Sequence, residues 1–182
     1  MTYEECINKV REFSEKFYNS LDFAHNMEHG KRVVKNAKMI AEQEGGNLFL
    51  IEVGAWLHQF HDNIIEVNNF IKTLDIEDEL KNQLYEIVKC RPEYISDESF
   101  LESKIVYDAD AMEVLSTYGM VREIICNGKC RDKEWEESVE DTIKVQKRFK
   151  EKLATKTAKE ILEEDLKIIE NFWESYKKWS SN

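Results

Sequence analysis

The sequence has few residues that interrupt helices and no long apolar run. One proline and six glycines are spread over 182 residues, so long helices are favoured. No apolar run approaches the roughly 20 residues that a membrane-spanning helix needs. The N-terminal segment MTYEECINKVREF is charged and lacks the apolar core of a signal peptide. We therefore expect a cytoplasmic protein whose four cysteines are reduced, with no membrane as a partner.

Basic residues are also scarce relative to acidic ones. The chain has 26 Lys and Arg against 37 Asp and Glu, which gives a net charge of −11. Binding to a nucleic-acid polymer requires basic patches that release counterions, so this partner class is not expected. A small anionic substrate remains compatible, because a local cluster of Lys, Arg and metal can outweigh the global charge.

The apolar periodicity predicts helices and no strand pair. The predicted helices cover residues 3–18, 27–44, 47–60, 62–74, 76–90, 98–108, 109–127, 134–153 and 157–179. The segment 47–60 is apolar almost all round and should be central and buried. We expect a single domain over residues 1–182, with a core over about 19–127 and C-terminal helices over about 134–180 packed on it. The aromatic last helix could instead bind a partner, and it hints at a homodimer.

The four histidines fall into two groups. His25 and His29 are four residues apart, and His58 and His61 are three apart, so each pair shares one face of a helix. His58 follows an almost unbroken apolar run. A buried neutral imidazole needs a partner for each nitrogen, and a metal, a carboxylate or a backbone carbonyl can serve. Taken alone, a single histidine on an apolar face is more often a satisfied core residue than a ligand.

Two further polar patterns could contribute metal ligands. Asp108 and Asp110 lie within an apolar segment, where a carboxylate costs free energy unless it is paired or metal-bound. Asp108 could instead cap the next helix. Mixed imidazole and carboxylate ligands suit Mn, Fe, Ni, Co or Zn. Cys126 and Cys130 in CNGKC could form half of a metal site, but no second pair follows at zinc spacing, so we favour thiols at a helix end.

Three motifs in order carry a family resemblance. They are HNMEHGKRV from His25, AWLH ending at His58, and DADAMEVLSTYGMVR from Asp108 to Arg122. Together they resemble the HD-domain metal-dependent phosphohydrolase superfamily, in particular its small stand-alone bacterial and archaeal members, over nearly the whole chain. The resemblance implies an all-α, HD-domain helical bundle with appended C-terminal helices. It also implies hydrolysis of a phosphate ester, of a nucleotide or small metabolite, by a metal-activated water.

The resemblance also implies roles for individual residues. It makes His29, His58 and Asp110 ligands of a divalent metal (Mn, Fe, Ni, Co, Zn or Mg) and places His25 near that metal. Arg32 and Arg122 match arginines that could hold the oxygens of a small phosphorylated substrate, although both could form ordinary ion pairs. Asp62 or Asp108 would transfer the proton.

The sequence departs from the family pattern at the His-Asp doublet, which here is His58-Gln59. A glutamine carbonyl can coordinate a cation but brings no charge. His61 or Asp62, within one turn, could compensate as a ligand. Relatives often carry a histidine near Cys90-Arg91-Pro92, and its absence favours one metal over two. Two alternatives follow: a degenerate HD domain that binds metal or nucleotide without catalysis, and a metal-free helical interaction module.

Overall fold

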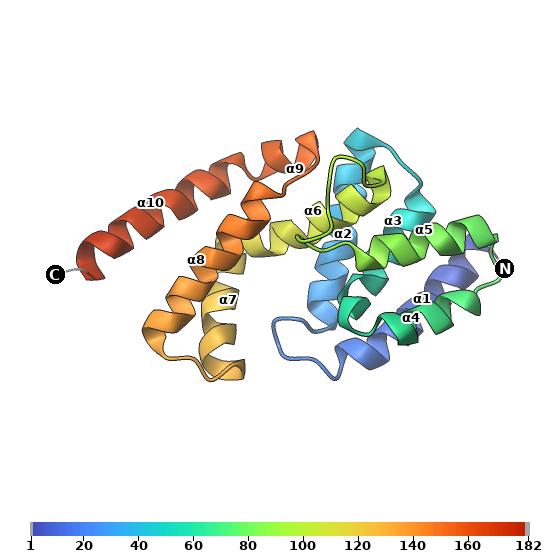
Figure 1. Ribbon diagram of the computed structural model, residues 1–182, viewed down its shortest axis with the longest axis horizontal. Coiled ribbons are helices and arrows are strands. Elements are labelled where there is room, and N and C mark those ends of the chain that lie inside the picture. Colours follow the sequence, from blue (N-terminus) through green and yellow to red (C-terminus); the bar gives the residue numbers. More distant parts are fainter. Residues whose placement is uncertain (1, 181–182) are drawn as a thin grey trace.

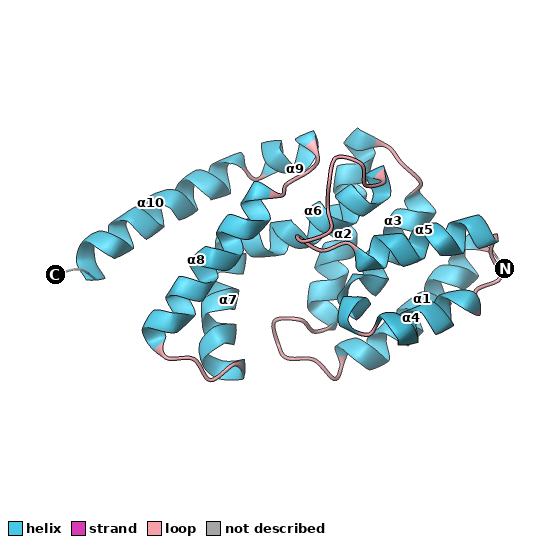
Figure 2. Ribbon diagram, in the orientation of Figure 1, coloured by secondary structure: helices cyan, strands magenta, loops and turns pink. Residues whose placement is uncertain are grey.

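The computed structural model of the chain describes residues 2–180, and all its regular elements are helical (Figures 1 and 2). This confirms the all-α fold class. The elements are α1 (Tyr3–Tyr18), α2 (Met27–Glu44), α3 (Leu48–Leu57), the 3₁₀ helix η1 (His58–Asp62), α4 (Ile64–Lys72), α5 (Asp78–Lys89), α6 (Leu101–Leu115), α7 (Thr117–Cys130), α8 (Trp135–Glu151), α9 (Lys156–Ile161) and α10 (Glu163–Ser180). None of the helices described is long and apolar enough to cross a membrane.

Side-chain caps fix where the first helices begin. Thr2 forms a capping box with Glu5 at the start of α1. The Asn26 side chain accepts hydrogen bonds from the backbone N–H groups of Glu28 and His29, which starts α2. Gly45 ends α2 with a φ of 81°, a conformation that favours glycine. The predicted bounds 3–18 and 27–44 are therefore confirmed.

The helix α3 lies at the centre of the core, as its apolar sequence predicts. Its residues 50–57 are all buried, and it contacts α1, α2, α5 and α6. The helices α2 and α6 pack on each other and on α3 (Figure 1). Residues of α1, such as Cys6, Val10 and Tyr18, also belong to this core, which therefore begins before residue 19. Because α2, α3 and α6 pack on one another, the side chains that they carry are held at fixed positions relative to each other.

Three predicted boundaries are wrong. The helix expected over 47–60 ends at Leu57 and tightens into η1. The break expected between residues 108 and 109 is absent, because α6 continues to Leu115. The break falls at Ser116, whose hydroxyl accepts from the Gly119 N–H and caps α7. The helix expected over 157–179 is divided into α9 and α10.

The C-terminal helices form a smaller core of their own. Met120, Val139, Ile169 and Trp173, from α7, α8 and α10, pack together. The helix α10 extends away from the α1–α5 end of the molecule, so the two ends of the described chain lie far apart (Figure 1). Phe172 and Trp179 on α10 are exposed. The partner-binding and homodimer expectations for this helix stay predictions.

Candidate metal centre

Two histidines and one aspartate from separate elements converge beside the core. His29 comes from α2, His58 from the start of η1 and Asp110 from α6. The two Nε2 atoms of the histidines lie 3.1 Å apart. The Asp110 Oδ1 atom lies 3.5 Å from Nε2 of His29 and 3.8 Å from Nε2 of His58. One ligand atom from each residue therefore lies within 4.8 Å of the other two.

The chain turn at the end of α3 fixes the orientation of His58. Its Nδ1 lies 2.7 Å from the carbonyl oxygen of Ala55, which can only accept, so Nδ1 carries the proton and donates it. The Nε2 lone pair is then directed at the cluster. Burial lowers the pKa of His58 to about 4, and nearby His29 adds to the decrease while Asp110 opposes it. His58 is therefore neutral at pH 7, the form that binds metals.

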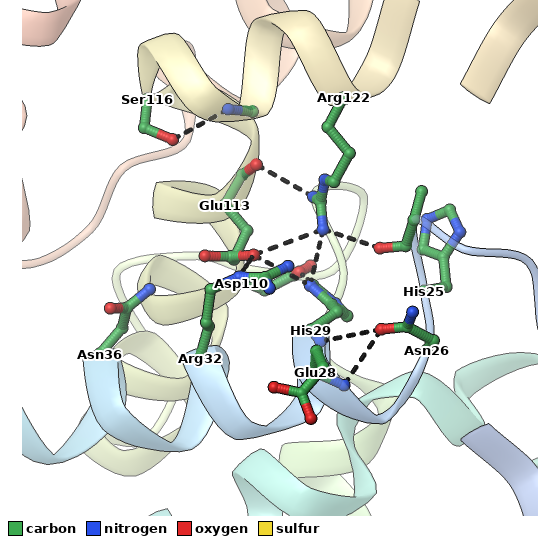
Figure 3. Close-up of polar contacts among 12 residues, drawn as sticks. His25, Asn26, Glu28, His29, Arg32, Asn36, Asp110, Glu113, Ser116 and Arg122 are labelled. Carbon is green, nitrogen blue, oxygen red and sulfur yellow. Dashed lines mark hydrogen bonds and ion pairs between the residues drawn. The ribbon is translucent and has the colours of Figure 1, made fainter. Parts of the chain in front are cut away.

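A carboxylate that the sequence analysis missed orients His29. The Glu113 Oε2 atom lies 3.4 Å from Nδ1 of His29, and it also accepts from Nε of Arg32 at 2.7 Å. Figure 3 shows this carboxylate between Arg32, His29 and Arg122. When His29 donates its Nδ1 proton to Glu113, its Nε2 lone pair is free for a cation. The sequence signal is the glutamate three residues after Asp110, on the same face of α6.

Arg122 ties this carboxylate to the neighbouring helix. Its Nη1 donates to the carbonyl oxygen of Ala24 at 2.7 Å and to Glu113 Oε2 at 3.3 Å, and Nη2 donates to the Glu113 carbonyl at 3.0 Å. The same Nη1 lies 3.0 Å from Nδ1 of His29. Burial tends to raise the pKa of Glu113, but hydrogen bonds from His29 and Arg32 lower it overall. Glu113 therefore stays ionised beside His29.

The three convergent residues fit a divalent cation. Burial tends to raise the pKa of Asp110, but His58, His29 and Arg122 outweigh it and leave the pKa below its usual value. The cluster thus combines an ionised carboxylate with two imidazole nitrogens that face the same point. Mixed ligands of this kind suit Zn, Mn, Fe, Co or Ni.

A cavity of about 570 Å³ opens over the cluster, which is a size typical of small-molecule sites. Four arginines line it: Arg91, Arg122, Arg131 and Arg148. Three of them pair with cavity-wall acids: Arg91 with Asp62 at 2.6 Å, Arg131 with Glu123 at 2.5 Å, and Arg148 with Glu93 at 3.1 Å. The cavity wall therefore consists of guanidinium–carboxylate pairs, and a phosphate binds a guanidinium there by replacing its carboxylate partner.

Four other predicted residues line the cavity outside the convergent group. They are His25, Gln59, His61 and Asp62. The Nδ1 atom of His61 donates to the carbonyl oxygen of His58 at 3.0 Å, and its Nε2 lies 3.4 Å from Asp62. Nδ1 of His25 lies 2.8 Å from the Asp22 carboxylate. Their roles as ligands or proton donors stay predictions.

Asp108 and Arg32 require corrections, because neither lines the cavity. The Asp108 carboxylate accepts from the backbone N–H groups of Ala154 and Thr155 and from the Thr155 hydroxyl, at 2.6 Å for the latter two. It therefore binds the segment directly before α9, whose N-cap is Thr155, and lies away from the cavity where a proton would be transferred. Arg32 is held by Glu113 and stacks over the Tyr118 ring at 5.0 Å, so it orients a carboxylate instead of holding a phosphate.

Comparisons with known proteins add relatives of known structure. No family model and no curated protein matches the sequence. The chain is 27 % identical to the Lin1889 protein of Listeria innocua, with a TM-score of 0.79 and coverage of 100 % and 98 % of the two chains. It is 26 % identical to an HD-superfamily hydrolase of Bacillus thuringiensis, with a TM-score of 0.75 and full coverage of both. Bacillus subtilis YpgQ in complex with ADP shares the fold at 21 % identity, a TM-score of 0.79 and coverage of 98 % and 96 %.

The helical bundle and the His29–His58–Asp110 cluster together indicate a class of protein. A helical domain that directs two histidines and an aspartate from separate helices into one cavity has the architecture of a metal-dependent hydrolase. The full-length structural match to an HD-superfamily hydrolase agrees with the order of the three motifs. In its full-length fold and in the order of its motifs, the chain resembles the HD-superfamily hydrolases, and Gln59 follows His58 at the second position of the doublet.

Proposed function

We propose that this protein is a metal-dependent hydrolase that cleaves a phosphate ester. The observation that carries the proposal is the convergence of His29, His58 and Asp110 at the base of an arginine-lined cavity. The structural likeness to an HD-superfamily hydrolase supports hydrolysis as the reaction class. The arginines support phosphate as the group that is recognised, because guanidinium matches phosphate oxygens in geometry and charge.

Each residue of the site has a separate role in such a reaction. When bound, a divalent cation held by His29, His58 and Asp110 supplies Lewis-acid activation of water and of a phosphoryl oxygen. Arg148 on the cavity wall, whose ion pair with Glu93 is half exposed, exchanges that partner for phosphate oxygens and offsets their charge. Asp62 also lines the cavity, is 76 % exposed beside Arg91 and exchanges a proton with water.

A nucleotide or a similarly sized phosphorylated metabolite is the substrate that we propose. YpgQ, which shares the fold, is described in complex with ADP. The rings of Tyr107 and Phe149 stack at 5.7 Å, and both residues line the cavity beside the arginines. An apolar wall next to a phosphate-binding region suits a molecule with a planar part and an anionic part.

Phosphate release from a panel of nucleotides and small phosphate esters tests the proposal. The protein is reloaded separately with Mn²⁺, Ni²⁺, Co²⁺, Zn²⁺ and Mg²⁺. We expect metal-dependent release by the natural chain, none by Asp110→Ala, and full activity in the matched control Asp97→Ala, which changes an exposed aspartate. Equal release by the natural chain and Asp110→Ala would contradict the proposal.

A second candidate function is binding of metal or nucleotide without turnover. Gln59 favours it, because this residue lines the cavity where the family pattern has a charged ligand. The variant Gln59→Asp decides between the two candidates, with Gln59→Ala as the control. An inactive natural chain that gains activity only in Gln59→Asp would establish the binding function. A natural chain at least as active as Gln59→Asp would exclude it.

A further inference from the structure

A second group of metal-ligating side chains lies beside the first. Asp22 and His25 come from the connection between α1 and α2, and Cys126 comes from α7. One ligand atom from each lies within 4.8 Å of the other two. The Asp22 carboxylate lies 2.8 Å from Nδ1 of His25 through Oδ1 and 3.6 Å from Sγ of Cys126 through Oδ2.

Backbone contacts hold this group in place. Asp22 Oδ1 accepts from the backbone N–H groups of Ala24 and His25, at 2.9 and 3.1 Å, which fixes the turn. Arg122 on α7 donates to the Ala24 carbonyl at 2.7 Å and so holds that turn against α7. The three ligand side chains are therefore brought together by the fold and not by flexible surface groups.

The chemistry of the group suits a borderline-soft divalent cation. A thiol, an imidazole and a carboxylate are the three side-chain types that bind Zn²⁺. The Cys126 side chain is fully buried, and in the absence of a cation its thiol donates to Asp22. In the sequence, Cys130 is the only candidate partner near Cys126. In the fold, Asp22 and His25, about 100 residues earlier in the chain, lie beside Cys126.

We propose that Asp22, His25 and Cys126 form a second cation site, for Zn²⁺ or a similar divalent metal, distinct from the His29–His58–Asp110 cluster. On binding, the metal–sulfur bond would form as the thiol proton leaves to water. This departs from the expectation of a single metal. The site flanks the first one, because the rings of His25 and His29 lie 5.9 Å apart.

Arg131 is close enough for its charge to act on Cys126 and Asp22, but its hydrogen bonds go to other residues. Arg131 donates to Glu123 Oε1 and to the Asn127 side-chain oxygen, both at 2.5 Å. Its charge is thus balanced by Glu123, while the Asp22 carboxylate faces the histidine and the thiol. A cation between these groups would be held by one carboxylate and one thiolate, which together match a divalent charge.

Titration with Co²⁺ tests the proposal, because only a cysteine ligand gives a thiolate-to-cobalt charge-transfer band. The Asp110→Ala variant removes the first cluster and isolates the second. In that background we expect the band to saturate at one equivalent of Co²⁺ and to disappear when Zn²⁺ is added. Adding Cys126→Ser should abolish the band, whereas adding Cys130→Ser, an exposed cysteine one turn further on the same helix, should keep it.

The opposite outcomes overturn the proposal. One is the absence of a charge-transfer band in Asp110→Ala. The other is a band that survives Cys126→Ser and is lost in Cys130→Ser. Thermal unfolding shows whether each variant is folded. If Cys126→Ser is not, Asp22→Asn serves in its place, since it keeps an oxygen for the turn and should weaken Co²⁺ binding at least tenfold. The second site does not depend on the hydrolase proposal, because the charge-transfer band is measured in the Asp110→Ala variant, which is expected to lack hydrolase activity.

Discussion

Asp108 and Asp110 lie two residues apart on α6 and have opposite surroundings. Asp108 faces α9, where it accepts hydrogen bonds from two backbone N–H groups and a hydroxyl. Asp110 faces the two histidines and the cavity. A helix turns by about 100° per residue, so positions i and i+2 point to different sides. One helix therefore supplies a carboxylate that holds the C-terminal helices and another that holds a cation.

The contrast teaches that a buried acid needs a partner, but its sequence does not say which partner. Both aspartates sit among apolar residues, and both would cost free energy if unpaired. For Asp108 the partners are 46 and 47 residues away at the start of α9. For Asp110 they are on α2 and η1. Substitutions at the two positions should consequently separate stability from metal binding.

The largest effect is expected for Asp110→Ala. This change removes the charged ligand of the cluster, and even changes to groups that only orient a ligand cost roughly 10–100-fold in metal affinity. We expect loss of metal at the first cluster by more than about 100-fold and loss of hydrolysis, with thermal unfolding close to that of the natural chain. Isothermal titration with Mn²⁺ or Co²⁺ measures the affinity. A large decrease in unfolding temperature with metal retained would reverse the assignment.

Asp108→Ala should give the converse result. Its removal leaves buried donors at the start of α9 without an acceptor, which costs about 2–4 kcal/mol of unfolding free energy. For a chain of this size the unfolding temperature should fall by roughly 5–15 °C. Metal affinity of the folded variant should not change. Unaltered stability combined with lost hydrolysis would restore Asp108 to the reaction.

Glu113→Gln should have an intermediate effect on the metal. The glutamine keeps the shape but removes the charge that orients His29 and pairs with Arg32. We expect metal affinity to fall by about 10–100-fold. The matched control is Glu52→Gln, a buried glutamate on α3 that pairs with Lys38 away from the cavity. Equal affinity in both variants would show that Glu113 does not act through His29.

Arg32→Gln should have the smallest effect, because Arg122 still holds Glu113. We expect metal affinity to fall by less than about tenfold, with KM for a phosphate ester nearly unchanged. The sequence-based interpretation of Arg32 as a phosphate ligand instead predicts a marked increase in KM at unchanged metal affinity. Steady-state kinetics at saturating metal separates the two.

Most of the fold and the centre of the site could be predicted from the sequence. The apolar segment of α3 predicts its central position, and caps such as Asn26 and Gly45 set the helix ends. The motifs identify His29, His58 and Asp110, which the structure brings together. These features depend on local spacing and composition, which a single sequence displays.

The features that the sequence did not predict depend on contacts between segments that are distant along the chain. The contacts of Asp108 require the segment before α9, and the position of Arg32 requires Glu113 on α6. The grouping of Asp22 with Cys126 joins residues about 100 positions apart. The break at Ser116 was also missed, since the chain between Asp108 and Ser116 has no proline or glycine to distinguish it. Only packing decides these features.

An anomalous-difference map from a crystal grown with Mn²⁺ would test the central claim most directly. We predict a peak between Nε2 of His29, Nε2 of His58 and the Asp110 carboxylate, within about 2.0–2.3 Å of each donor. The same map should show Asp108 still bonded to Thr155. A fully loaded crystal without a peak at these three residues, or with the metal bound by Asp108, would contradict the account.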